Sequence, residues 1–272
     1  MDGLTLAVMA AACLIAQGTA LFVPATPVWL HWVGQLAMPL CVFLVGWGFE
    51  HAGNRTDFLI RLHMASVVTA IVQTLLHVDV NPFPVLVQIA LIIALLSLRN
   101  RLRRVIALAA YALWQVMWFV LLNEAFSFHA FPVLYDYRHL VTAFFALVPT
   151  QGHRVCCIIL GILLWRFRRS PAVIASVMTV CSLLALVMVN TRLGLGVLYL
   201  PYRTGAADPA IVSPTETAWS IALQYLGFDP FAMGSAPFGP RSPWMMVFAL
   251  PFMLAYDRRR GAYGTTGRIP HL

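Results

Sequence analysis

Residues 48–62 bring an acid, an imidazole and two guanidinium groups together at the end of an apolar segment. Glu50 and His51 are adjacent, and a carboxylate beside an imidazole that titrates near neutral pH can act as an acid–base pair. Arg55 and Arg61 can hold phosphate oxygens through paired N–H groups. These residue types predict proton transfer beside a phosphate-bearing ligand. A basic loop that only sets membrane topology fits the same residues and stays open as the alternative.

Other polar residues lie in or beside apolar stretches and are weaker candidates for substrate contacts. His77 and Asn81 come just before a proline, where they fit either a substrate contact or a solvated loop. His153 follows Pro149, which predicts an interrupted helix, and interrupted helices often line a polar cavity. Residues 123–139 mix aromatic and charged side chains, which suits either a peptide or glycan site or an ordinary interfacial loop.

The composition indicates which class of protein positions these residues. The chain has 272 residues, of which 61% are hydrophobic and 10% charged, and its mean hydropathy is +0.81. Soluble domains carry about 25% charged residues, so this chain has too little charge to cover a surface in water. It also contains apolar runs long enough to cross about 30 Å of hydrocarbon. The composition therefore predicts an integral membrane protein and argues against a large soluble α/β core.

The apolar runs predict an all-α polytopic bundle of about eight transmembrane helices, within a range of seven to nine, in a single membrane domain over residues 1–272. The first run is interpreted as a retained span and not a signal peptide, because no Lys or Arg precedes it. Residues 218–228 are expected to lie at the interface or to re-enter the membrane. The predicted spans are 4–23, 28–49, 62–80, 84–98, 105–122, 139–165, 171–189 and 244–256.

Clustered arginines predict the orientation of these spans. The 18 basic residues gather mainly in 55–61, 99–104, 166–169 and 258–260. The positive-inside rule makes these segments cytoplasmic, which places both termini in the cytoplasm if the broken segment 139–165 crosses once. The net charge of +8 then reflects topology and contact with the lipid bilayer. No nucleic-acid partner is predicted, since the basic residues lie in short loops and not on a soluble face.

The cysteines and the known short motifs add no further chemistry. All five cysteines lie in apolar segments at irregular spacing, which gives neither a disulfide framework nor a metal signature. The sequence has no phosphate-binding Walker A loop, no GxGxxG and no HExxH. Neither ATP-driven transport nor zinc proteolysis has motif support, and no metal site is predicted.

Residues 32–96 carry a set of short motifs that match a known pattern. Residues 34–39 read GQLAMP and residues 48–55 read GFEHAGNR, followed by Arg61 and Leu62; Asn81 opens a later span. Near the C-terminus, 254–261 read LAYDRRRG and the chain ends PHL. These segments resemble the TraX family of conjugative-pilus proteins, which has Gly-Arg-x-Ala-Phe-Pro, Gly-Phe-x-His-Thr-x-Asn and Leu-x-Tyr-Asn-Gly-x-x-Gly patterns. The chain is also similar to the TrbP conjugal-transfer proteins.

This resemblance implies a bacterial inner-membrane acetyltransferase that modifies the N-terminus of a pilin subunit, or of another small membrane peptide, with acetyl-CoA. It implies that His51 is the base that takes the amine proton, that Glu50 orients it, and that Asn54 donates to the carbonyl oxygen. The arginines expected to bind the CoA phosphates are Arg55, Arg61, Arg99 and Arg101. His77, Asn81 and His153 are weaker candidates for substrate contacts.

The chain departs from the family pattern at three places, one of which is the missing Tyr of the C-terminal Tyr-Pro-x-His-Leu motif, and two other functions stay open. Ala16-Gln17 stands where the family has an Asp-His pair, and Gly34-Gln35 replaces Gly-Arg. The missing pair favours a non-enzymatic pilus-assembly or conjugal-transfer protein of the inner membrane. A small-molecule transporter, with the interrupted helix near His153 as its site, is the third hypothesis.

Overall fold

The computed structural model describes residues 2–23, 25–76, 81–125, 137–147, 154–204, 219–220, 222–223, 228, 233, 235–238 and 242–256. Their helices run in the order α1 (Gly3–Phe22), α2 (Val28–Gln35), α3 (Ala37–His51), α4 (Arg55–Leu76), α5 (Phe83–Leu96), α6 (Arg101–Ala125), α8 (Arg138–Phe144), α9 (Arg154–Arg166), α10 (Pro171–Asn190), α11 (Arg192–Leu198), α12 (Leu200–Arg203), the 3-10 helix η2 (Pro243–Ala249) and α14 (Leu250–Leu254).

The predicted helical fold is confirmed for this part of the chain, which contains no β-strand. Four helical stretches are long and apolar enough to cross a membrane: Gly3–Ala20, Val28–His51, Arg55–Leu75 and Pro171–Asn190. Shorter apolar helices cover Phe83–Leu96, Val155–Arg166 and Pro243–Leu254. Each of the seven stretches overlaps a predicted span. Most of the predicted interfacial segment 218–228 lies outside the described residues.

Two helix boundaries differ from the prediction. The span predicted over 28–49 is divided at Leu36 into α2 and α3, because Pro39 has no N–H to donate to the carbonyl one turn before it. The helix predicted from residue 62 already begins at Arg55. Its first turn contains Arg55 and Asp57, so the predicted span was begun only after Arg61, but the Asn54 side chain accepts from the Thr56 N–H at 3.0 Å and caps the helix.

The sixth predicted segment is interrupted, although residues 149–153, where the break was predicted, lie outside the described residues. The helix α8 ends at Phe144 and α9 begins at Arg154. Ala146 has a φ of 48°, in the left-handed region that residues with a side chain seldom adopt. The Leu147 N–H donates to the Thr142 carbonyl at 2.8 Å and the Ala146 N–H to that of Ala143 at 3.2 Å. This is the Schellman pattern that closes a helix C-terminus.

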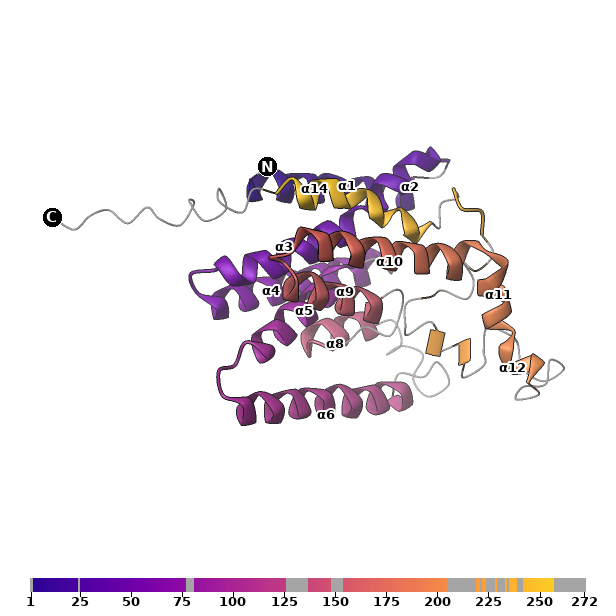
Figure 1. The fold of residues 1–272 in the computed structure, drawn as a ribbon. Helices are drawn as coiled ribbons and strands as arrows, with labels where there is room; N and C mark the ends of the chain where they lie inside the picture. Colours follow the sequence, from indigo (N-terminus) through magenta and orange to yellow (C-terminus); the bar gives the residue numbers. More distant parts are fainter. Residues whose placement is uncertain are drawn as a thin grey trace.

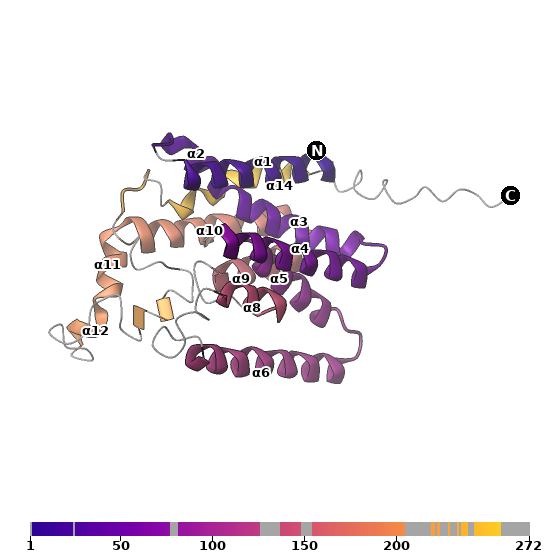
Figure 2. The ribbon, with the colours of Figure 1, turned by 180° about the vertical axis from the view of Figure 1, so that it is seen from behind.

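The helices lie alongside one another, with α1 and α14 at one margin and α6 at the opposite margin (Figures 1 and 2). Near the middle, α3 packs against α1, α5 and α9. Its buried residues include Leu40, Val42 and Phe49, and they belong to one apolar core that also takes side chains from α5, α9 and α10. The margins instead expose large apolar side chains, such as Leu4 on α1 and Leu113 on α6.

The links α3–α4, α5–α6 and α9–α10 lie at the same end of the molecule as the N-terminus (Figure 1). We call this the arginine-rich end, because each of these links contains or borders an arginine cluster. A Cβ placed on Gly3 would lie 3.6 Å from the Tyr256 hydroxyl oxygen, so the end of α14 also reaches it. Here Asp2 caps α1, and hydrogen bonds from the Thr5 side chain and N–H lower the pKa of its carboxyl.

Candidate functional site

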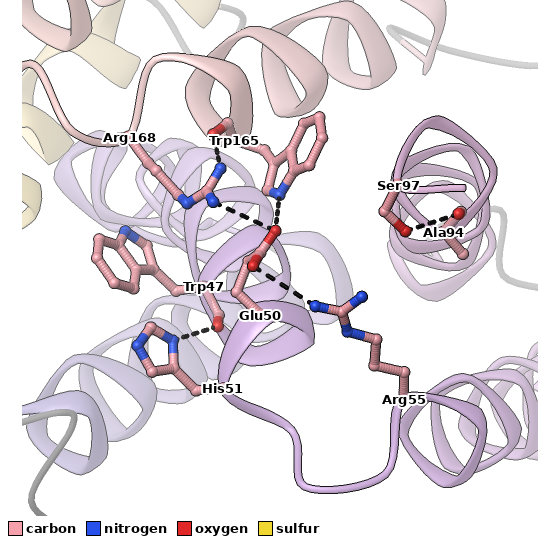
Figure 3. Close-up of polar contacts among 8 residues, drawn as sticks. All are labelled: Trp47, Glu50, His51, Arg55, Ala94, Ser97, Trp165 and Arg168. Atoms are coloured by element: carbon pink, nitrogen blue, oxygen red, sulfur yellow. Dashed lines mark hydrogen bonds and ion pairs between the residues drawn. The ribbon is translucent and has the colours of Figure 1, made fainter. Parts of the chain in front are cut away.

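Glu50, in the last turn of α3, is the centre of a charged contact set at the arginine-rich end (Figure 3). Its Oε1 accepts a hydrogen bond from the Trp165 indole at 2.9 Å and lies 3.3 Å from an Arg168 guanidinium nitrogen. Its Oε2 lies 3.7 Å from a guanidinium nitrogen of Arg55. We call these four residues the Glu50 cluster. It joins α3, the start of α4 and the α9–α10 link through one carboxylate.

Small residues allow Trp165 to reach this carboxylate. A Cβ placed on Gly46, one turn before Glu50, would lie 3.3 Å from the Trp165 Cβ. A Cβ on Gly161, one turn before Trp165, would lie 2.7 Å from Ile89 Cδ1. The glycines therefore let α9 approach both α3 and α5 closely, which brings the indole N–H within hydrogen-bond distance of Glu50.

The two arginines of the cluster are held differently. Arg168 is 20% exposed, donates to the Trp165 carbonyl at 2.9 Å and lies 5.3 Å from the centre of that indole ring. Arg55 is 49% exposed and lies 5.4 Å from the centre of the Phe49 ring. Arg168 is therefore fixed by three interactions, whereas Arg55 forms a longer, more hydrated pair that a competing anion can replace.

His51 points away from the Glu50 carboxylate and lies against Trp47 (Figure 3). The two rings stack with centres 5.0 Å apart, and Nδ1 lies 2.9 Å from the Trp47 carbonyl oxygen. A carbonyl can only accept, so Nδ1 carries the proton of the neutral ring and the lone pair lies on Nε2. The ring is exposed. His51 thus offers a free basic nitrogen, oriented by Trp47 and not by Glu50 as the sequence predicted.

The remaining predicted site residues are not part of the Glu50 cluster. Arg61, Arg99 and Arg101 are exposed: Arg101 begins α6 as Arg55 begins α4, whereas Arg61 lies within α4 and Arg99 in the α5–α6 link. The Asn54 oxygen is used to cap α4. Asn81 is 6% exposed at the opposite end, where its oxygen accepts from the Phe83 N–H at 3.0 Å.

His77 and His153 lie outside the described residues. Trp165 and Arg168 were not predicted as site residues. The only signal for them was that 166–169 and 55–61 were expected on the same side of the membrane. Among the described residues, no three His, Cys, Asp or Glu side chains come together as metal ligands would.

A second polar contact set lies in the interior, where α5, α6 and the end of α8 meet. Gln88 is fully buried, donates to the Ala146 carbonyl and accepts from the Tyr111 hydroxyl. Gln115 donates to the same carbonyl at 3.1 Å, and the Trp114 indole donates to the Phe145 carbonyl at 3.2 Å. We call Gln88, Tyr111, Gln115 and the Ala146 carbonyl the Gln88 cluster. It satisfies backbone groups that the interrupted helix α8 leaves open.

Comparison with family models, with curated proteins and with solved structures finds no match to this chain.

Proposed function

We propose that the chain is a membrane-bound acetyltransferase of the bacterial inner membrane. It transfers an acetyl group from acetyl-CoA to the N-terminal amine of a pilin subunit or another small membrane peptide. The observation that carries the proposal is the exposed His51 ring, whose Nδ1 is tied to the Trp47 carbonyl and whose Nε2 is left as a base. The resemblance over residues 32–96 suggests the reaction, and His51 is a group able to take the amine proton.

Eight spans with both ends in the cytoplasm fit this location. The four long and three short apolar helices make seven. The helix α6 is the eighth, because it has 25 residues and an apolar stretch over 105–122. Apolar side chains on the margins, such as Ile15 and Val116, are 70% and 60% exposed, which suits contact with lipid and not with water. The arginine-rich end then faces the cytoplasm, which is also the side of acetyl-CoA.

Each residue at this end has a distinct role in the proposed reaction. His51 Nε2 takes a proton from the amine as the amine nitrogen attacks the thioester carbonyl. The C–N bond of the amide forms, the C–S bond breaks, and the leaving thiolate takes that proton back from His51, so that CoA departs as its thiol. Arg55 and Arg61 bind CoA phosphates, with Arg99 and Arg101 on the neighbouring link. The Asn54 amide nitrogen is the proposed donor to the carbonyl oxygen. Glu50 acts as a positioning residue that holds α3, α4 and α9 together.

The test is His51→Ala in cells that express the full chain and its pilin, with acetylation read by mass spectrometry of the pilin N-terminus. We expect acetylation to disappear while the protein still accumulates in the membrane. His31→Ala is the matched control, since His31 is a partly buried histidine on α2. Intact acetylation in His51→Ala would show that His51 is not the base.

A non-enzymatic assembly protein is the second candidate. The family's Asp-His pair is absent at Ala16-Gln17, and Gln17 instead packs against Gly34, where a Cβ would come within 2.8 Å of the Gln17 Cβ. Gln17 therefore serves contact between α1 and α2. A purified protein that neither binds nor turns over acetyl-CoA, from a strain whose pili fail to assemble without it, would favour this function.

A small-molecule transporter is the third candidate. The interruption between α8 and α9 and the interior Gln88 cluster favour it, because broken helices and buried amides often line transport sites. Solute flux into proteoliposomes that contain the purified protein, compared with protein-free liposomes, separates transport from the other two functions.

A further inference from the structure

The buried face of α4 is polar at two positions. Ser66 is 1% exposed and Gln73 is 5% exposed, and Ala70 between them is fully buried. Residues spaced by four and then three positions lie on one face of a helix. The helix packs against α5 and α8, whose own buried polar residues are Gln88 and Thr142. Polar side chains from three helices thus face a shared interior.

Two of these side chains, and that of Asn81 just before α5, have hydrogen-bonding groups without a partner. They are the Ser66 hydroxyl, the Gln73 amide nitrogen and the amide nitrogen of Asn81. Each lies in a side chain more than nine-tenths buried. A buried donor left unpaired costs about 1–3 kcal/mol. Two neighbours avoid this cost, since Thr69 and Thr74 donate to the Ala65 and Ala70 carbonyls at 2.6 and 2.9 Å.

We propose that these unpaired donors line a water-accessible polar site between α4, α5 and α8, entered from the end opposite the arginine-rich end. The proposal rests on the membrane location given under Proposed function but not on acetyl transfer. Ser66 lies 11 residues after Arg55, or about 16 Å along the helix axis, which is near the middle of a bilayer. Gln73 and Asn81 lie progressively closer to the far end. The three donors therefore follow a path from that surface to the membrane centre.

The chemistry of the lining defines the class of ligand. None of the buried polar side chains that the structure describes carries a charge. The unused groups on Gln73 and Asn81 are amide N–H groups, which can only donate, and the Ser66 hydroxyl can also donate. The site therefore takes water and small neutral solutes that offer oxygen acceptors, such as carbonyl or hydroxyl compounds. A dissociated ion would find no counter-charge there.

Substituted-cysteine labelling tests this site in intact cells. Ser66→Cys, Gln73→Cys and the small change Ala70→Cys are made in the full chain, with the five native cysteines replaced by alanine. A membrane-impermeant methanethiosulfonate reagent is added outside. Val68→Cys is the matched control, because Val68 lies on the same helix but is 55% exposed on the lipid-facing side. We expect buried-face labelling at least about tenfold faster than control labelling, because only a hydrated thiol ionises to the reactive thiolate.

The outcomes separate the alternatives. Cationic and anionic forms of the reagent should label Ser66→Cys at similar rates if the lining is uncharged, and a strong preference for one charge contradicts the proposed ligand class. Labelling of none of the three buried positions, in protein that remains folded by size-exclusion chromatography, overturns the site. Labelling only from the arginine-rich end overturns its direction. Fast labelling of Val68→Cys alone instead contradicts the membrane location, so the two failures are distinguishable.

Discussion

The Glu50 cluster and the Gln88 cluster each join three segments of the chain, the first through charged groups and the second through neutral ones. At the arginine-rich end a carboxylate that is 20% exposed joins α3, α4 and the α9–α10 link through two guanidinium groups and an indole. In the interior a fully buried amide joins α5, α6 and the end of α8 through neutral groups alone.

The difference follows from the surroundings of each cluster. Charge is tolerated at the partly exposed end, where two guanidinium groups lie beside the carboxylate, and amides or hydroxyls replace it in the interior, where the partners of Gln88 are neutral. Glu and Gln have nearly the same shape. Gln88→Glu therefore places a charge in the interior, and Glu50→Gln removes the charge from the arginine-rich end, with little change in packing. Such exchanges are the sharpest way to test this difference.

Gln88→Glu should have the largest effect. It places a carboxylate at a position with no exposure and no cation among its hydrogen-bond partners, at an expected cost of several kcal/mol. We expect a large drop in the unfolding midpoint of the protein in mild detergent, measured by intrinsic fluorescence. Gln35→Glu on α2, where the side chain is only partly buried, is the control. Equal midpoints for the two variants would contradict an interior that tolerates neutral polar groups but not a charge.

Glu50→Gln is the reverse exchange and should cost less. It keeps the acceptor for the Trp165 indole but leaves Arg168 facing a neutral amide, and hydrogen bonds to charged groups contribute about 1.5–3 kcal/mol. Chemical unfolding in detergent should show a loss in this range. Asp57→Asn, which removes an exposed carboxylate in the first turn of α4, is the control. A loss no greater than in the control would mean that the charge of Glu50 does not stabilise the bundle.

Tyr111→Phe should have a smaller effect still. It removes only the hydroxyl that donates to Gln88, and hydrogen bonds between membrane helices average about 0.6 kcal/mol with a maximum near 1.7 kcal/mol. The loss is measured as for Glu50→Gln, with Tyr199→Phe, at a more exposed tyrosine, as the reference. A loss above that maximum would show that the interior network acts as one cooperative unit.

Arg55→Gln should have the smallest effect on stability. Its pair with Glu50 is long and half exposed, and such pairs contribute about 0–1 kcal/mol. Arg168→Gln should cost more, because Arg168 is less exposed and also donates to the Trp165 carbonyl. Repeating both measurements near 1 M salt, where screening acts over about 3 Å, should abolish the Arg55 effect and leave most of that of Arg168. A larger loss of stability in Arg55→Gln than in Arg168→Gln would contradict this ranking of the two arginines.

The helices could be predicted from the sequence because apolar length is a local property. Prediction failed where a local exception mattered, namely the division at Leu36 and the early start of α4 at Arg55. Both had signals. Pro39 disrupts the hydrogen-bond ladder, and Asn54 before a polar turn is a helix cap. A hydropathy profile averages over such residues and does not register either.

The site could be predicted only in part. Glu50 and Arg55 are close in sequence, so the 48–62 segment was enough to place them in one candidate site, but their ion pair was not predicted. Trp165 lies 115 residues from Glu50, and no spacing rule links them. The orientation of His51 was within reach, since Trp47 lies one helical turn before it, but the predicted helix ended at Phe49 and hid that relation.

The contact between Gly161 and Ile89 makes the two clusters depend on each other. Ile89 follows Gln88 on α5, and Trp165 follows Gly161 by four residues, or about 6 Å along α9. A side chain at position 161 would have to displace the fully buried Ile89 side chain or move α9 away from α5, and such a movement would carry the indole away from Glu50. Mutational tolerance at the charged end is thus set by an apolar contact in the interior. A substitution that separates α9 from α5 in the interior would therefore weaken the contacts of Glu50 at the surface, although no charged residue had been altered.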